Sequence, residues 1–303
     1  MAKDSKTEKN PRIEIPREFL TALNTLKVPF KSVRLEKLAS FPDYPVNPTD
    51  YIFLEGKDLR QDSYPDLWVC KYKLGIGDAV DEAAERIGMV LGNTAFENNG
   101  KGYIGKISRE QALKLNLVLG GKTLNVRQAK DFLALLLSNK AYDGTGKKIN
   151  KDELVQITNE ILVANNTGEW LEDFFTGKEN NLVLNKNYIL QGDTLFPYYH
   201  HNLTHCLTRS KKGYLRTSSG IDLNDWMENS TAQGFIKEEP PIPISNKGLI
   251  YVPPYKENHG VAISNEMIMC GLFCQVDSRR AKDKFLGVRH VRFAHDNKCR
   301  TKN

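Results

Sequence analysis

The division of amphipathic segments along this chain of 303 residues constrains its fold most. In the first half, several segments place apolar residues three or four positions apart, which is the spacing of one helix face. These segments are residues 78–91, 108–116, 128–141 and 151–164. Beyond about Asn166 the pattern changes to short β-prone runs between turn residues. Helices that precede strands, instead of alternating with them, predict an α+β fold.

The local signals add boundaries to this outline. Strands are predicted at residues 67–72, 182–184, 188–190, 249–252, 271–274 and 288–293. Ser108 and Gln111 have the spacing of a capping box at the start of a helix. The Gly/Asn-rich residues 92–105 are predicted to form a loop. Residues 143–148 lack the central glycine and the final glutamate of a calcium loop, so that we expect a turn between two helices there.

Composition and charge exclude several classes of protein. The net charge of +6 is carried largely by the two ends of the chain, so the body offers no basic stripe for nucleic acid. No apolar stretch reaches the roughly eighteen residues of a membrane span, and the N-terminus lacks the apolar core of a signal peptide. The five cysteines are irregularly spaced, which disfavours a disulfide framework. We therefore expect a reducing compartment, such as the cytoplasm, and no secretion by the usual route.

The sequence contains no established catalytic motif: no Walker lysine, no nucleophile elbow and no His-Glu-x-x-His element. His200, His201, His205 and Cys206 could hold a metal, but their setting after Pro197 is more typical of a strand end. The prediction is a chain that is not an enzyme and that uses no metal or cofactor.

Two of the cysteines, Cys270 and Cys274, lie four positions apart. On a strand, positions four apart project to the same face, so the two thiols could do redox or metal chemistry together. The alternative is that both are small apolar residues in a buried strand, which is a common role of free cysteine. We expect the second.

Three stretches, in this order, resemble a known family. Residues 123–132 resemble the entry to the second helix of C-type lectin folds of the formylglycine-generating-enzyme-like branch, with Asn125 where proline is usual. Residues 220–229, with their Asp-Trp pair, and the Leu-Gly-Val-Arg ending within residues 285–292 resemble the variable proteins of archaeal and viral diversity-generating retroelements. The resemblance covers about residues 61–303 and leaves residues 1–60 as an N-terminal extension, partly disordered.

The resemblance implies a C-type lectin-like fold with helical insertions, in which a first strand near residue 67 pairs close to the closing strand near residue 290. In that family the C-terminal segment is diversified by adenine-targeted mutagenesis and binds ligand. Carried over by position, the hypervariable segment spans about residues 261–290. The candidate ligand-binding residues are Ile263, Asn265, Met267, Met269, Gly271, Phe273, Gln275, Asp277, Ser278 and Arg279.

The local pattern agrees with a displayed surface, because residues 261–269 mix polar and bulky apolar side chains without a clean core period. The methionines and Phe273 would give adaptable apolar contacts, and the polar residues hydrogen bonds and charge. The resemblance thus implies a non-enzymatic binding protein, with an unidentified protein or cell-surface ligand as its partner and a monomer as the expected state.

Two residues in the resembling stretches are predicted to be structural. Trp226 follows Asp222 and Leu223 on a short helix and is expected to anchor the core. Arg289, inside the closing strand, is expected to pair with a buried carboxylate or with loop carbonyls.

Two other functions remain as alternatives. The first is a formylglycine-generating-enzyme-like oxidase that binds copper through Cys270 and Cys274. The second is a viral structural or adaptor protein whose first sixty residues dock to a larger assembly.

Overall fold

The computed structural model describes residues 44, 46–58, 62–91, 95–98, 101–163, 167–177, 182–203, 219–237, 248–252, 259–266, 269–277 and 286–294. All of them lie within one compact unit, residues 40–303. None of the helices in these ranges has the length and apolar character that crossing a membrane requires.

The predicted helices are confirmed. They are α2 (Asp78–Arg86), α3 (Arg109–Val118), α4 (Val126–Leu137) and α5 (Lys151–Leu162), followed by a short α7 (Leu223–Glu228). Ser108 and Gln111 form the predicted capping box in both directions. Helix α4 starts two residues earlier than predicted because Asn125 caps it in a second capping box with Gln128.

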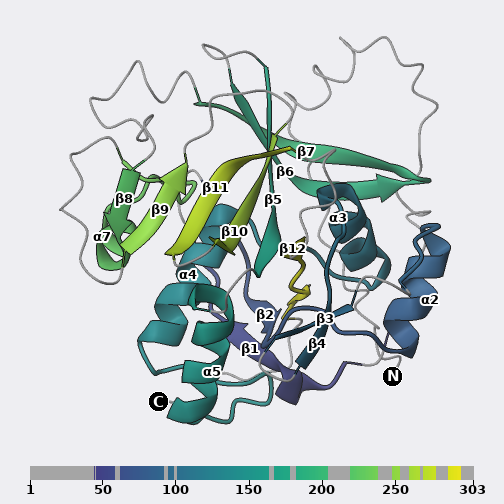
Figure 1. Cartoon of the computed structure of the whole chain (residues 1–303), viewed down its shortest axis with the longest axis horizontal. Coiled ribbons are helices and arrows are strands. Elements are labelled where there is room, and N and C mark those ends of the chain that lie inside the picture. The colour runs from purple at the N-terminus through teal and green to yellow at the C-terminus, as the bar shows by residue number, and fades with distance from the viewer. Residues whose placement is uncertain are drawn as a thin grey trace, which may run out of the picture. The chain divides into compact units, whose positions relative to one another are not determined.

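A large mixed sheet forms the centre of the unit (Figure 1). Its strands are β5 (Gly168–Thr176), β6 (Val183–Gln191), β7 (Thr194–Asn202), β8 (Ser219–Asp222), β9 (Gly248–Val252), β10 (His259–Glu266), β11 (Met269–Asp277) and β12 (Leu286–Gly287). The order is β7-β6-β5-β10-β11-β9-β8, and β12 pairs with β5. Most pairs are antiparallel; β11–β9 and β12–β5 are parallel. Helices before a largely antiparallel sheet make the fold α+β, as predicted.

A second sheet joins the beginning and the end of the unit. It contains β1 (Tyr51–Leu54), which follows a 3-10 turn at Pro48–Asp50, then β2 (Leu67–Cys70) and β13 (Val291–Phe293). Strand β2 lies in the middle, antiparallel to both neighbours, with Val69 opposite Val291. The predicted pairing of a strand near residue 67 with the closing strand is therefore confirmed. The predicted domain start at residue 61 is too late, because β1 is a strand of the folded body.

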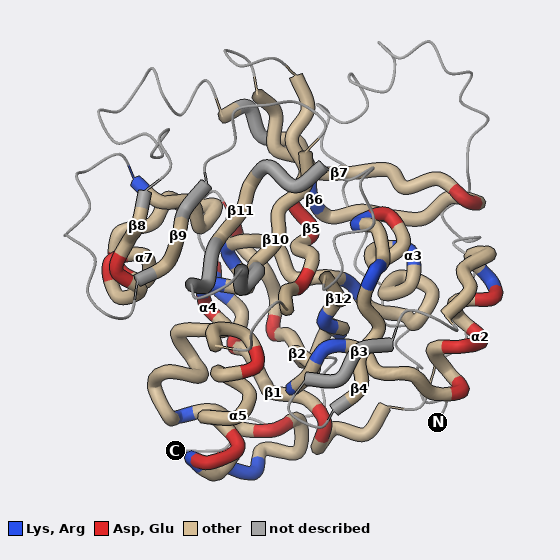
Figure 2. The backbone as a smooth tube through the Cα atoms, viewed as in Figure 1, with Lys and Arg blue, Asp and Glu red and all other residues tan. Residues whose placement is uncertain are grey.

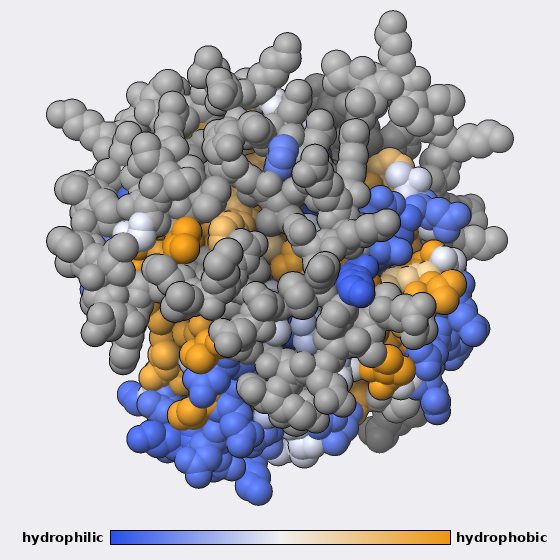
Figure 3. Space-filling model, in the orientation of Figure 1, coloured by the Kyte–Doolittle hydropathy of each residue, from blue (hydrophilic) through white to orange (hydrophobic). Residues whose placement is uncertain are grey.

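Helices cover both faces of the large sheet. Leu171 and Val261 lie in one core cluster with α4 and α5, whereas Trp170 and Ala262 lie in another with α2 and α3. Neighbouring residues of a strand point to opposite faces, so the two clusters are the two sides of the sheet. The outer surface over α5 is hydrophilic (Figure 3), as its amphipathic sequence requires.

Two connections differ in how well they were predicted. Residues 92–105, expected to be a loop, contain the hairpin β3 (Ala95–Asn98) and β4 (Lys101–Ile104). Residues 143–148 form the expected turn between α4 and α5: the Asp143 carboxylate accepts hydrogen bonds from the backbone N–H of Thr145 at 2.9 Å and of Lys147 at 3.0 Å. The Asp143 side chain thus stabilises the turn through hydrogen bonds to the backbone that follows it.

The central strand β5 carries acidic residues in the interior. Glu169, Glu172 and Asp173 are each at most 4% exposed. Glu169 pairs with Arg289 at 3.0 Å and Glu172 with Lys122 at 3.2 Å, while Asp173 accepts the backbone N–H of Val126 at 2.6 Å. Buried carboxylates persist only with such partners.

Asp173 makes the stability of the protein depend on pH. Burial, with Glu172 and Asp62 nearby, raises the pKa of Asp173 from 3.8 to about 7, against the opposing charge of Lys186. Between these values the folded state keeps a proton that the unfolded state has released, so stability falls as the pH rises, by about 1.4 kcal/mol per pH unit for this one group.

Asp173→Asn is therefore expected to gain stability relative to wild type as the pH rises from 4 to 7. Urea unfolding of both proteins across this window measures the difference. Asp193→Asn, at an exposed turn between β6 and β7, is the control and should stay within about 0.5 kcal/mol of wild type. If the difference in unfolding free energy between Asp173→Asn and wild type does not vary with pH, the raised pKa of Asp173 is contradicted.

Candidate functional site

The closing segment, residues 286–293, is held at several points. Strand β12 pairs with Gly168 and Glu169 of β5, and β13 pairs with β2. Between them Val288, Arg289 and His290 are buried. Figure 2 shows Lys or Arg positions beside β2 and β12, where this segment runs.

Arg289 makes the main side-chain contacts that hold this segment in place. Its side chain is 1% exposed, and its guanidinium lies 2.6 Å from Glu160 and 3.0 Å from Glu169. It also donates to the backbone carbonyls of Cys70 at 3.0 Å and Lys71 at 2.6 Å. Burial raises the pKa of Glu160, but Arg289 and Lys73 outweigh it and bring that pKa down to about 2. The predicted pairing of Arg289 with buried carboxylates and loop carbonyls is confirmed.

The residues next to Arg289 are also closely packed, so that few other side chains would fit there. A Cβ on Gly287 would lie 2.8 Å from the carbonyl oxygen of Ile104, so only glycine fits this position of the Leu-Gly-Val-Arg ending. His290 Nδ1 lies 3.1 Å from Asn116 Oδ1, and Arg292 donates to His290 Nε2 at 3.3 Å. Burial and the nearby charge of Arg292 lower the pKa of His290 to about 3, so the ring is neutral. Residues 286–290 therefore have a structural role, since buried contacts fix them in place, and we call them the structural lock.

The predicted display segment begins as a central hairpin. Strands β10 and β11 pair from His259–Asp277 to Glu266–Met269, with a register shift near Gly260, and β10 also pairs with β5. The base of the hairpin belongs to the core: Val261, Ile263, Leu272 and Cys274 are at most 2% exposed. The assignment of Ile263 to ligand binding is therefore wrong. Residues 261–263 lack a two-residue period because both sheet faces are covered there.

The structure describes the other candidate contacts to different extents. Phe273 is partly exposed. Asn265, Met269, Gly271, Gln275 and Asp277 have their backbone in β10 or β11, and their side chains lie outside the described part of the structure. Met267, Ser278 and Arg279 lie wholly outside the described residues.

Cys274 is an inert thiol. It is fully buried in the core, and burial raises the pKa of its thiol well above the ordinary value, which suppresses the reactive thiolate. Its predicted role as a small apolar residue of a buried strand is confirmed. The side chain of Cys270 is not among those described. The burial of Cys274 keeps this thiol from solvent, and the copper alternative at the pair stays a prediction.

Trp226 anchors the core, as predicted. It is 1% exposed, and its indole N–H donates to the carbonyl of Gly234 at 2.8 Å. Helix α7 is held against α4, where the Lys130 ammonium donates to the backbone carbonyl of Met227 at 3.1 Å.

The histidine cluster lies partly on an edge strand. His200 and His201 belong to β7, and His200 Nδ1 lies 2.5 Å from Asn185 Oδ1. His205 and Cys206 lie outside the described residues. Within the described ranges, no group of three His, Cys, Asp or Glu side chains is arranged to hold a metal ion.

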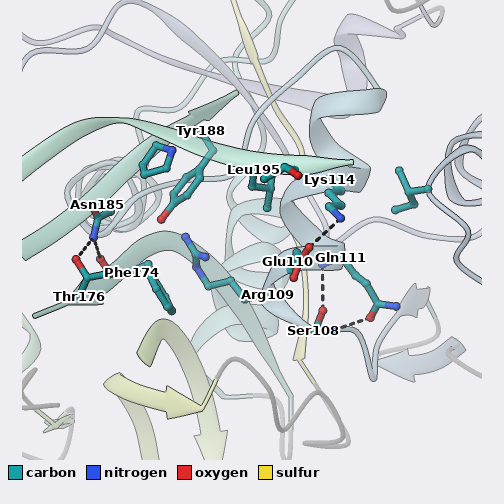
Figure 4. A pocket seen from close by; sticks show the side chains of 13 residues that line it. Ser108, Arg109, Glu110, Gln111, Lys114, Phe174, Thr176, Asn185, Tyr188 and Leu195 are labelled. Atoms are coloured by element: carbon teal, nitrogen blue, oxygen red, sulfur yellow. Dashed lines mark hydrogen bonds and ion pairs between the residues drawn. The ribbon is translucent and has the colours of Figure 1, made fainter. Parts of the chain in front are cut away.

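A pocket lies between α3 and the strands β5, β6 and β7 (Figure 4), next to Gly260 of β10, where an added Cβ would lie 2.6 Å from Arg109 Cδ. Its volume is about 860 Å³, within the range of small-molecule sites. The described lining residues are Ile87, Ser108, Arg109, Glu110, Gln111, Lys114, Phe174, Thr176, Asn185, Tyr188, Thr194, Leu195 and Pro197. The capping box placed Arg109 in the first turn of α3, but no sequence pattern indicated which strands would face it.

Comparison of the chain with protein-family models, with curated proteins and with solved structures gives no match.

Proposed function

We propose that this chain is a non-enzymatic ligand-binding protein: the variable protein of a diversity-generating retroelement, built on a C-type lectin-like scaffold of the formylglycine-generating-enzyme-like branch. The observation that carries the proposal is the fastening of the closing segment. It is held by β12 on β5, by Arg289 on Glu160 and Glu169, and by β13 on β2.

This fastening suits a scaffold that must tolerate variation. Strand β11 ends at Asp277 and β12 begins at Leu286, so the residues between them are joined at both ends to fixed strands. The polar contacts of Arg289 are with Glu160, Glu169, Cys70 and Lys71, none of which belongs to the proposed variable segment. Surface segments carried by a rigid frame are the usual place for variable recognition. The pairing of β2 with β13 also brings the two ends of the body together, as the resemblance implies.

The buried base of the hairpin narrows the proposed surface. It excludes Val261, Ile263, Leu272 and Cys274, which pack in the core. The remaining proposed contacts are Asn265, Met267, Met269, Gly271, Phe273, Gln275, Asp277, Ser278 and Arg279. Their mixture of flexible apolar and polar side chains is suited to binding an unidentified protein or cell-surface ligand.

The DNA beside the gene tests the proposal. We expect a reverse-transcriptase gene and a near-copy of the codons for residues 261–290, differing from them mainly at adenines. The differences should fall on the codons of the proposed contacts and spare Val261, Ile263, Leu272 and Cys274. The codons for residues 286–290, which form the structural lock, serve as an internal control and should also be spared. Absence of a near-copy, or differences concentrated on the core codons, would refute the proposal.

A further inference from the structure

The pocket between α3 and β5–β7 contains a buried cation that has no carboxylate partner among the described residues. Arg109 is 5% exposed, and its guanidinium donates to the backbone carbonyl of Glu172. Every other buried Lys or Arg in the described part of the chain lies within 4 Å of a carboxylate oxygen. A buried charge without a counter-ion is costly, so its retention at the wall of a cavity indicates an anion that completes the site.

The surroundings of Arg109 hold the guanidinium in place. The rings of Phe174 and Tyr188 each have their centroid 4.8 Å from its central carbon, one from β5 and one from β6. Figure 4 shows the guanidinium between these two rings at the wall of the pocket. Its Nε has no hydrogen-bond partner among the described residues. A guanidinium fixed between aromatic rings loses little freedom when it binds an anion through its edge.

The charged residues that line the pocket favour a ligand with a single negative charge. Glu110 and Lys114 pair with each other at 2.8 Å and cancel, which leaves the charge of Arg109. The amino-terminal end of α3, with its positive partial charge, lies beside the pocket and adds to the attraction. A doubly charged phosphate would exceed the charge of Arg109, the one cation without a carboxylate partner among the described lining residues.

The other walls favour an apolar body on the ligand. Ile87, Leu195 and Pro197 line the pocket together with the two aromatic rings, and Thr176 and Thr194 add hydroxyl groups. Pockets of this kind bury the apolar part of a ligand and use few polar groups to orient it.

From these observations we infer that the pocket is a binding site for a small monocarboxylate with an apolar body, and that Arg109 binds its carboxylate. None of the described lining residues is a proposed display residue on β10 or β11, so the inference does not depend on that proposal.

Ligand-observed NMR and thermal unfolding of the full chain with benzoate test this inference. We expect benzoate to bind with a Kd of about 1 mM, typical of a fragment-sized ligand. Benzamide, which has the same shape without the charge, and inorganic phosphate should each bind at least about tenfold more weakly. Equal binding of either probe, or no binding of benzoate, would overturn the inference.

Variants locate the binding. Arg109→Gln is expected to weaken benzoate binding by about tenfold or more, the loss of a charge-assisted hydrogen bond. Arg127→Gln removes an Arg on α4, across the sheet, and should leave the Kd within about threefold. Leu195→Trp fills the pocket from β7 while Arg109 stays in place, and should also abolish binding even if Arg109→Gln does not fold. Benzoate binding that survives in Leu195→Trp would refute the site.

Discussion

Arg289→Met is expected to lower the free energy of unfolding by about 3–5 kcal/mol at pH 7, because it leaves Glu160 and Glu169 buried without their shared cation. Two backbone carbonyls, of Cys70 and Lys71, also lose their donor. Urea unfolding followed by circular dichroism measures the loss. The matched control is Arg86→Met, which breaks an exposed pair with Glu82 on α2 and should cost at most about 0.5 kcal/mol.

The effect of Arg289→Met should depend on pH in a defined direction. The folded-state pKa of Glu160, at about 2, lies below its ordinary value of 4.5. The corresponding stabilisation is present above pH 4.5 and is lost as the pH falls toward 2. The gap between wild type and variant should therefore narrow from pH 6 to pH 3. A gap that stays constant, or a loss below about 1 kcal/mol at pH 7, would mean that Arg289 does not fasten the ending.

The helices could be predicted from the sequence because their signals are local. Capping pairs such as Ser108 with Gln111, and apolar residues at helical spacing, depend only on near neighbours. The two halves of β6, predicted separately, are one strand that continues through Asn187, which adopts a positive φ of 56°. An asparagine such as Asn187 breaks the run of β-prone residues in the sequence, but the strand continues to pair on both sides of it.

The central strand β5 was missed for a tertiary reason. Glu169, Glu172 and Asp173 make its sequence polar, and the partners that permit their burial come from distant positions such as Arg289 and Lys122. No pattern within residues 168–176 contains this information. The same limit applies to Ile263, whose neighbours alternate in no clear way because helices cover both faces of β10.

The pocket was missed because it combines one predictable residue with unpredictable neighbours. The capping box placed Arg109 in the first turn of α3, but Phe174 and Tyr188 reach it only through the order of the strands. Arg289 was easier to predict, since a charge inside a closing strand requires a partner wherever that partner lies in the sequence.

Trp226→Ala is expected to cost about 3–5 kcal/mol of unfolding free energy, because it opens a cavity under α7 in the main core. The loop that follows depends on the indole. Gly234, at a φ of 91°, lies so close to α4 that a Cβ there would be 2.8 Å from the backbone of Arg127, and its carbonyl accepts the indole N–H. Phe235, next in the chain, packs against Phe175 of β5 with ring centroids 5.8 Å apart.

Trp226→Phe is the matched control, since it keeps an aromatic ring and removes the indole donor. It should cost less than Trp226→Ala, about 1–3 kcal/mol, mainly from the unpaired carbonyl of Gly234. Urea unfolding gives both values, and hydrogen exchange at the amides of α4 separates global loss of stability from local opening of α7. If the Trp226 side chain served ligand contact, its substitution would weaken ligand binding without lowering the free energy of unfolding. Values within about 1 kcal/mol of wild type for both variants would therefore contradict the role of Trp226 as a core anchor.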